Sequence, residues 1–190
     1  MSNEKIIETA VRKNSNLLNL LKLLEQLQIP NACVTAGAVK QTVLNYLHKD
    51  KITKNIKDYD VFYFDDKDLS FEAEDKVISF IKTNLKINGL NMPLDIKNQA
   101  RVHIWAKEKF GVSDLPYKNI FESLQSFSAT ISAIGIYLDD DKLKIIAPYG
   151  TDDIINGIIR PTHFGHFADS RFDAKAKSWL ERFPYLKVEK

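Results

Sequence analysis

Several features that would narrow the class of this chain are scarce in its 190 residues. Cys33 is the only cysteine, which excludes an internal disulfide and a zinc site built from cysteines, and which favours a reducing compartment. No stretch approaches the roughly 18 apolar residues of a membrane-spanning helix, and the charged N-terminus lacks the apolar stretch of a secretory signal. We therefore expect a cytoplasmic protein with no membrane partner and a buried, unreactive thiol.

A large excess of charge is also absent, because 27 lysines and arginines face 25 acidic residues. The net charge of +2 gives no overall field that would attract nucleic acid or a membrane surface. Any nucleic-acid partner would have to bind a local basic patch. No repeat, low-complexity tract or linker-like segment divides the chain, so we expect residues 1–190 to form a single domain.

What the chain does contain is the apolar patterning of an α/β protein. Apolar residues at spacings of three and four predict helices over 3–28, interrupted near Asn14, and over 38–47. An alternating segment at 58–64, a helix beginning at Ser70 and a short strand at 92–96 predict two neighbouring parallel strands. Further on we expect strands at 131–138 and 143–147 around a turn at 139–141, a core helix that Thr151 caps and Pro161 stops, and a last helix at 171–182.

Two aspartates of the strand at 58–64 are the first candidates for chemistry. Alternation along a strand places Asp58 and Asp60 side by side, and the parallel unit would bring Asp95 near them. Neighbouring carboxylates repel unless a cation or open solvent screens them, and transfer of a phosphoryl or nucleotidyl group requires divalent cations with oxygen ligands. The three aspartates are therefore candidate metal ligands. The alternative is a strand end that dips into water.

A second candidate is the step Ala36, Gly37, Ala38, which opens the helix at 38–47. Free N–H groups at a helix start can bind a phosphate, and Lys40, one turn further on, would add a positive charge. Ala36, Gly37 and Lys40 are therefore candidate phosphate-binding residues. The alternative is a tight turn with no ligand.

A third candidate is the polar run at 97–103, which follows Asp95 directly. Its side chains Asn98, Gln99 and Arg101 could bind a sugar, a base or an acceptor phosphate. The same side chains could equally form hydrogen bonds with the buried backbone of a loop, and Arg101 could pair with an acid. The sequence does not choose between these two interpretations.

Five segments taken together resemble a known family. They are AGAVKQTVLNYLH, KDYDVFYFD, LDIKNQARVH, APYGTDDIINGIIRPT and KSWLERFPYLKV, in this order across residues 32–188. Their order and spacing are similar to those of small bacterial nucleotidyltransferase-like proteins of the DNA polymerase beta superfamily. The resemblance implies a polymerase-beta-like nucleotidyltransferase core, with a mixed sheet of about four to five strands flanked by helices. The helical segment at 1–30, expected from its apolar pattern, precedes this core and is not specific to the family.

For function, the resemblance implies transfer of a nucleoside monophosphate from a nucleoside triphosphate (NTP) to an acceptor hydroxyl or phosphate. Gly37 would belong to the phosphate-binding turn, and Asp58 and Asp60 would be the paired metal ligands. Asp95 would be the third acid, as a metal ligand or general base. Two Mg²⁺ (or Mn²⁺) ions would bridge the carboxylates and the triphosphate. The acceptor, whether a small molecule, a tRNA or a protein, is not readable from the sequence, nor is the oligomeric state.

The chain departs from the family's pattern at the glycine turn. Alanines flank Gly37 where a serine or a second glycine is usual, so a phosphate-binding hydroxyl is missing unless Thr35 supplies it. Lys40 stands where an arginine is typical, and lysine cannot form the bidentate fork of arginine with phosphate. Two alternatives therefore stay open: a catalytically impaired nucleotide- or partner-binding module on the same fold, and a metal-dependent phosphohydrolase.

Overall fold

The computed structural model describes residues 1–110, 116–164 and 166–190. Its strands are β1 (Cys33–Thr35), β2 (Tyr59–Tyr63), β3 (Leu94–Asn98), β4 (Gly135–Asp139), β5 (Lys142–Ile146), β6 (Ile158–Ile159) and β7 (Lys187–Val188). Its helices are α1 (Asn3–Lys13), α2 (Ser15–Gln26), α3 (Ala36–Leu47), α4 (Phe71–Ile87), α5 (Val102–Phe110), α6 (Ile120–Gln125), α7 (Asp152–Asn156) and α8 (His166–Arg182), with short 3₁₀ turns η1 (Gln99–Arg101) and η2 (Thr130–Ser132).

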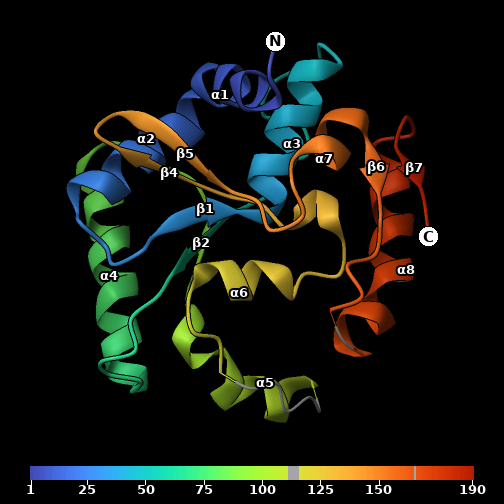
Figure 1. Ribbon diagram of the computed structural model, residues 1–190. Coiled ribbons are helices and arrows are strands. Elements are labelled where there is room, and N and C mark those ends of the chain that lie inside the picture. Colours follow the sequence, from blue (N-terminus) through green and yellow to red (C-terminus); the bar gives the residue numbers. More distant parts are fainter. Residues whose placement is uncertain (111–115, 165) are drawn as a thin grey trace.

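The first five strands form one mixed sheet in the order β3-β2-β1-β4-β5. β2 and β3 are parallel, whereas the other neighbouring strands of this sheet are antiparallel. Figure 1 shows α4 and α8 on opposite sides of the molecule, with α6 between them. This arrangement confirms the predicted α/β class and the mixed sheet. None of the described helices combines the length and the apolar character that a membrane crossing requires.

The N-terminal segment folds as two helices, as its apolar pattern predicts. α1 ends and α2 begins at Asn14, whose side-chain oxygen accepts a hydrogen bond from the backbone N–H of Leu17. An asparagine at this position satisfies one of the free N–H groups of a helix start, which explains why the second helix begins here. Leu17, Leu20, Leu21 and Leu24 are buried in the main core, where the predicted stripe requires them.

The unit β2, α4, β3 positions the candidate site. Ser70 caps α4 by accepting a hydrogen bond from the backbone N–H of Ala73, which confirms the predicted helix start. The crossover through α4 brings β3 parallel to β2, and Asp60 is the register partner of Asp95. The predicted proximity of these two acids is thus confirmed. β3 extends two residues beyond its predicted end, because its ladder with β2 continues to Asn98.

The sheet separates two apolar clusters. Tyr59, Val61 and Tyr63 of β2 are part of the main core, which also includes residues of α1 to α4. Phe62 alternates to the other face, where it packs in a second cluster with Cys33 and residues of α6. Cys33 is buried, as predicted, and burial raises the pKa of its thiol to about 12.

Two predictions about the second half are partly wrong. β4 begins only at Gly135, because the chain before it is turned by η2, in which the backbone N–H of Ala133 donates to the carbonyl of Thr130. The core helix predicted to run to Pro161 is the short helix α7, which ends at Asn156. It ends there because Gly157 adopts a left-handed conformation with φ +68°. The residues after it form β6, which pairs with β7.

Candidate functional site

Three aspartates lie at the N-terminal ends of the two parallel strands. Asp58 directly precedes β2 and is exposed, and Asp60 is the second residue of that strand and is half-buried. Asp95, the register partner of Asp60 on β3, has a side chain that is 45% exposed. The structure therefore brings the three predicted acids to one end of the sheet.

Asp60 is the acid whose ionisation is most strongly perturbed. Burial, together with the negative charges of Asp58 and Asp95, raises the pKa of Asp60 to about 6, although Lys97 and Lys175 act in the opposite direction. The charged form of Asp60 is therefore disfavoured by burial and by its two acidic neighbours. A cation bound among the three carboxylates would relieve the repulsion between them.

The three aspartate carboxylates suit a hard divalent cation, but they do not form a complete metal site in the structure. In the part of the chain that the structure describes, no three Asp, Glu, His or Cys side chains form a group that could hold a metal ion. Asp95 is paired instead with Lys97, two residues further along β3. Because carboxylate oxygens are the ligands that Mg²⁺ prefers and Lys97 is a flexible side chain, a cation could displace the lysine. Metal binding by Asp58, Asp60 and Asp95 stays a prediction.

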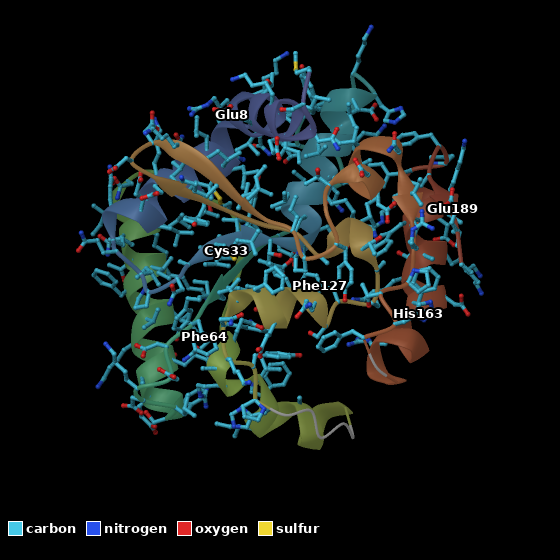
Figure 2. The ribbon with its side chains drawn as sticks, in the orientation of Figure 1. Glu8, Cys33, Phe64, Phe127, His163 and Glu189 are labelled. Carbon is cyan, nitrogen blue, oxygen red and sulfur yellow. The ribbon has the colours of Figure 1, made fainter. Side chains whose placement is uncertain are left out.

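A cavity of about 330 Å³ lies beside Asp58, which is part of its lining. Gly37 forms another part of the wall, and no heavy atom lies within 4 Å of the position that a Cβ would take there. Ala36, also in the wall, has φ +54°, a left-handed conformation that disfavours residues with a Cβ. Figure 2 shows Phe127, a further lining residue, between the sheet and α8. The turn at the start of α3 is thus open to a ligand and locally strained.

Lys40 lies in the wall of this cavity with only 1% of its surface exposed. Its Nζ donates a hydrogen bond to Ser132 Oγ at 3.1 Å and lies 3.3 Å from the ring centre of Trp179. Burial, followed by the positive charges of Arg182 and Lys175, lowers the pKa of Lys40 well below its usual value. A bound anion would stabilise the charged form of this lysine.

Four residues of α8 that were not predicted also line the cavity: Lys175, Ser178, Trp179 and Arg182. Their spacing of three, one and three residues places them on one face of the helix. With Lys40 and Lys57, the lysine and the arginine of α8 give the described lining four cationic side chains. Trp179 and Arg182 fall within the string KSWLERFPYLKV that carries the family resemblance. That string was the available signal, but it does not reveal which helix face lines the cavity.

Thr35 does not replace the hydroxyl that is missing beside Gly37. Its side chain is completely buried, and its Oγ1 donates a hydrogen bond to the carbonyl of Ile134 at 2.5 Å. It also makes no side-chain hydrogen bond at the start of α3. The glycine turn therefore has no side-chain hydroxyl of its own for a phosphate.

The polar run after β3 is engaged largely within the protein. Asn98 accepts a hydrogen bond from the backbone N–H of Asp65 and donates one to the Asp65 carbonyl. Arg101 donates to the carbonyl of Leu69 at 2.8 Å and forms an ion pair with the buried side chain of Glu74. These contacts are the ones that the structural interpretation of the run requires.

Two other polar groups of this segment differ from their neighbours. The Nε2 of Gln99 and the Nδ1 of His103 are buried and have no hydrogen-bond partner among the described residues. Neither residue is part of the lining of the cavity beside the aspartates. Ligand binding by Asn98, Gln99 and Arg101 stays a prediction, and for Asn98 and Arg101 the contacts favour a structural role.

A larger cavity, of about 580 Å³, lies near the C-terminal end of β2. Its lining includes Phe64, Tyr137 and the acids Asp65 and Asp66, but none of the three predicted metal ligands and no part of the glycine turn. The smaller cavity is the candidate site, because an acid, an open helix start and several cations line it.

Comparisons with known proteins point to one family. The sequence profile of a nucleotidyltransferase family matches residues 22–188. No curated protein matches the chain. An NMR structure described as a CCA-adding enzyme head domain is similar with a TM-score of 0.78 and 20% identity, over 98% of this chain and 95% of that one.

Two structures of CCA-adding enzyme, in complex with CTP and with ATP, are also similar, with TM-scores of 0.60 and 0.56 and identities of 19% and 18%. They cover 100% and 98% of this chain, which spans only 44% and 42% of their length. At these identities the similarity shows a shared fold. The predicted nucleotidyltransferase fold is therefore confirmed.

Proposed function

This chain belongs to a nucleotidyltransferase family, and on that premise we propose that it moves a nucleoside monophosphate from an NTP to an acceptor hydroxyl or phosphate, with the help of divalent cations. The observation that carries the proposal is the position of the acids. Asp60 and Asp95 are register partners at the end of the sheet where Asp58 joins a cavity with cationic walls. Nucleotidyl transfer needs this combination, carboxylates for cations beside cations for phosphates.

The triphosphate would lie in the 330 Å³ cavity, against the open backbone of Gly37. N–H groups at a helix start attract phosphate, and Lys40 and Lys175 add positive charge in the same wall. Arg182 brings a guanidinium from α8, which can offer the fork geometry that the lysine at position 40 cannot. The C-terminal helix would in this way compensate for the altered turn.

The cations, Mg²⁺ or Mn²⁺, would be held by Asp58, Asp60 and Asp95. When bound, they would neutralise phosphate oxygens and activate the acceptor hydroxyl. The chain itself keeps Asp60 among other acids, in a position that favours exchange of a proton for a cation. Asp95, once Lys97 has moved away, would be available to orient the acceptor hydroxyl and take its proton.

The nucleotide and the acceptor are proposed only as classes. CTP and ATP are the first NTPs to test, since CCA-adding enzymes of similar fold were solved with them. A small molecule, a tRNA and a protein side chain are the acceptor classes. The loop before Asp58 carries Lys49, Lys51, Lys54 and Lys57, a local basic segment that would suit an acceptor bearing phosphate.

A second candidate function is binding of nucleotide without turnover. It is favoured by the ion pair that occupies Asp95 and by the loss of Thr35 as a phosphate-binding hydroxyl. Binding of NTP with no release of pyrophosphate would distinguish this module from the transferase.

The test is transfer of label from α-phosphate-labelled CTP and ATP, with Mg²⁺ or Mn²⁺, into the small-molecule, RNA and protein fractions of a cell extract. Asp60→Asn is compared with Asp75→Asn, which removes an exposed acid on α4. We expect label in one fraction with the wild type and Asp75→Asn, and none with Asp60→Asn. Nucleotide binding without transfer would favour the second function. Full transfer by Asp60→Asn would refute the assigned site.

A further inference from the structure

The cavity contains a buried hydroxyl that the protein does not use. Ser128, three residues after the end of α6, lines the cavity and has only 5% of its surface exposed. Its Oγ has no hydrogen-bond partner among the described residues. Other buried side-chain atoms of the described residues also lack a partner, but none of them belongs to a residue that lines this cavity. An unpaired buried hydroxyl costs free energy, so its presence here points to a ligand that pairs with it.

The neighbours of Ser128 define the chemistry of that ligand. Ser132, from the same segment, accepts the hydrogen bond of Lys40 and keeps its own O–H proton available to donate. Gly37 lies open in the same lining, which holds four cationic side chains and one acid, Asp58. A wall of cations and hydroxyl donors suits an anion with several oxygens better than an apolar base.

The glycine turn beside Ser128 in the lining offers no hydroxyl of its own. Alanines flank Gly37, and the hydroxyl of Thr35 is committed to a backbone carbonyl. We infer that Ser128 supplies the missing phosphate-binding hydroxyl, from the segment after α6 instead of the glycine turn, and donates a hydrogen bond to a phosphate oxygen of the bound triphosphate. The inference deepens the proposed function and rests on it in placing a triphosphate in this cavity.

The test measures binding directly, by isothermal titration calorimetry with MgATP, MgCTP and inorganic triphosphate with Mg²⁺. Ser128→Ala removes the hydroxyl, Ser128→Thr keeps one, and Ser123→Ala is a matched control. Ser123 lies in α6, is buried, and donates its hydroxyl to the Ile120 carbonyl outside the cavity. Because a hydrogen bond to a charged group is lost, Ser128→Ala should bind both the NTPs and inorganic triphosphate about tenfold more weakly. Ser128→Thr should stay within about twofold of the wild type, and Ser123→Ala should bind as the wild type does.

Thermal unfolding separates this role from a structural one. Removing an unpaired buried hydroxyl should leave the melting temperature of Ser128→Ala unchanged or raised, whereas a structural hydroxyl would lower it. Wild-type affinity of Ser128→Ala for inorganic triphosphate would overturn the inference, and so would a loss confined to NTPs, since the hydroxyl would then contact the nucleoside. Triphosphate binding that depends on Ser128 supports the inference even if no nucleotidyl transfer is detected, so the two proposals can fail separately. A wild-type protein that binds no triphosphate overturns the inference.

Discussion

The two ends of the β2–β3 pair differ in whether their charged groups have partners of opposite charge. At the C-terminal end, Arg101 and Glu74 are buried together as an ion pair, and both side-chain polar groups of Asn98 are hydrogen-bonded. At the N-terminal end, Asp60 and Asp95 lie side by side with like charge, and the pKa of Asp60 is raised. The ion pair at the first end stabilises the fold, whereas repulsion left in a folded protein is typical of functional sites, which makes the second end the candidate site.

The largest effect should come from breaking the satisfied end. Arg101→Leu leaves Glu74 buried without its partner, and we expect the free energy of unfolding to fall by about 3–5 kcal/mol. Urea unfolding measures this. The double variant with Glu74→Leu should recover much of the loss, since no buried charge remains. A loss below about 1 kcal/mol in the single variant would contradict the contrast between the two ends.

Breaking the repulsive end should affect chemistry more than folding. Asp60→Asn should lower the rate of nucleotidyl transfer roughly several hundredfold, because an acid that would hold the cation is lost. It should also weaken Mn²⁺ binding while the far-ultraviolet circular dichroism stays unchanged. Titration with Mn²⁺ is the decisive measurement, and wild-type affinity in the variant would exclude Asp60 as a ligand.

The pH dependence of stability sharpens the same comparison. The pKa of Asp60 is about 6 in the folded chain against an ordinary value of 3.8, so the folded state binds this proton more tightly. The resulting cost to stability is nearly absent below about pH 4 and complete above about pH 7, on the order of 3 kcal/mol. Asp60→Asn should therefore be more stable than the wild type at pH 7.5 without metal, and equally stable at pH 4. Equal stability at both pH values would show that the carboxylates do not repel.

The smallest effect concerns Lys40, whose buried Nζ contacts Ser132 and Trp179 but forms no ion pair with a described carboxylate. Lys40→Met keeps the length of the side chain and removes a buried group whose charged form burial disfavours, so the free energy of unfolding should rise by up to about 1 kcal/mol. Affinity for inorganic triphosphate should fall about tenfold, because a cation is removed from the wall. Lys82→Met, at an exposed position of α4, is the control. Unchanged triphosphate affinity in Lys40→Met would remove this lysine from the site.

Much of the fold could be predicted from local patterns. The stripe of α2, the alternation along β2 and the serine at the start of α4 each act within a few residues, and the parallel crossover then fixed Asp60 against Asp95. The end of α7 was missed because the isoleucine spacing outweighed Gly157, whose left-handed conformation stops the helix.

The rest of the site could not be predicted because it depends on tertiary packing. Nothing in the sequence shows that Lys175 and Trp179 face the cavity, since several helix orientations would bury an apolar stripe. For the same reason, the partner of Arg101 and the unpaired state of Ser128 become visible only when distant segments are in place.

The register of β2 with β3 has one more consequence, for how ligands can be found. Because the acids of the two strands meet only when the strands have paired, the site does not exist in the unfolded chain. Anything that binds it therefore binds the folded form alone and raises the melting temperature with its concentration, by about 2.7 kcal/mol of added stability at a hundredfold excess over the dissociation constant. A thermal-shift screen of nucleotides, cations and candidate acceptors would thus identify ligands of this site before any activity is known.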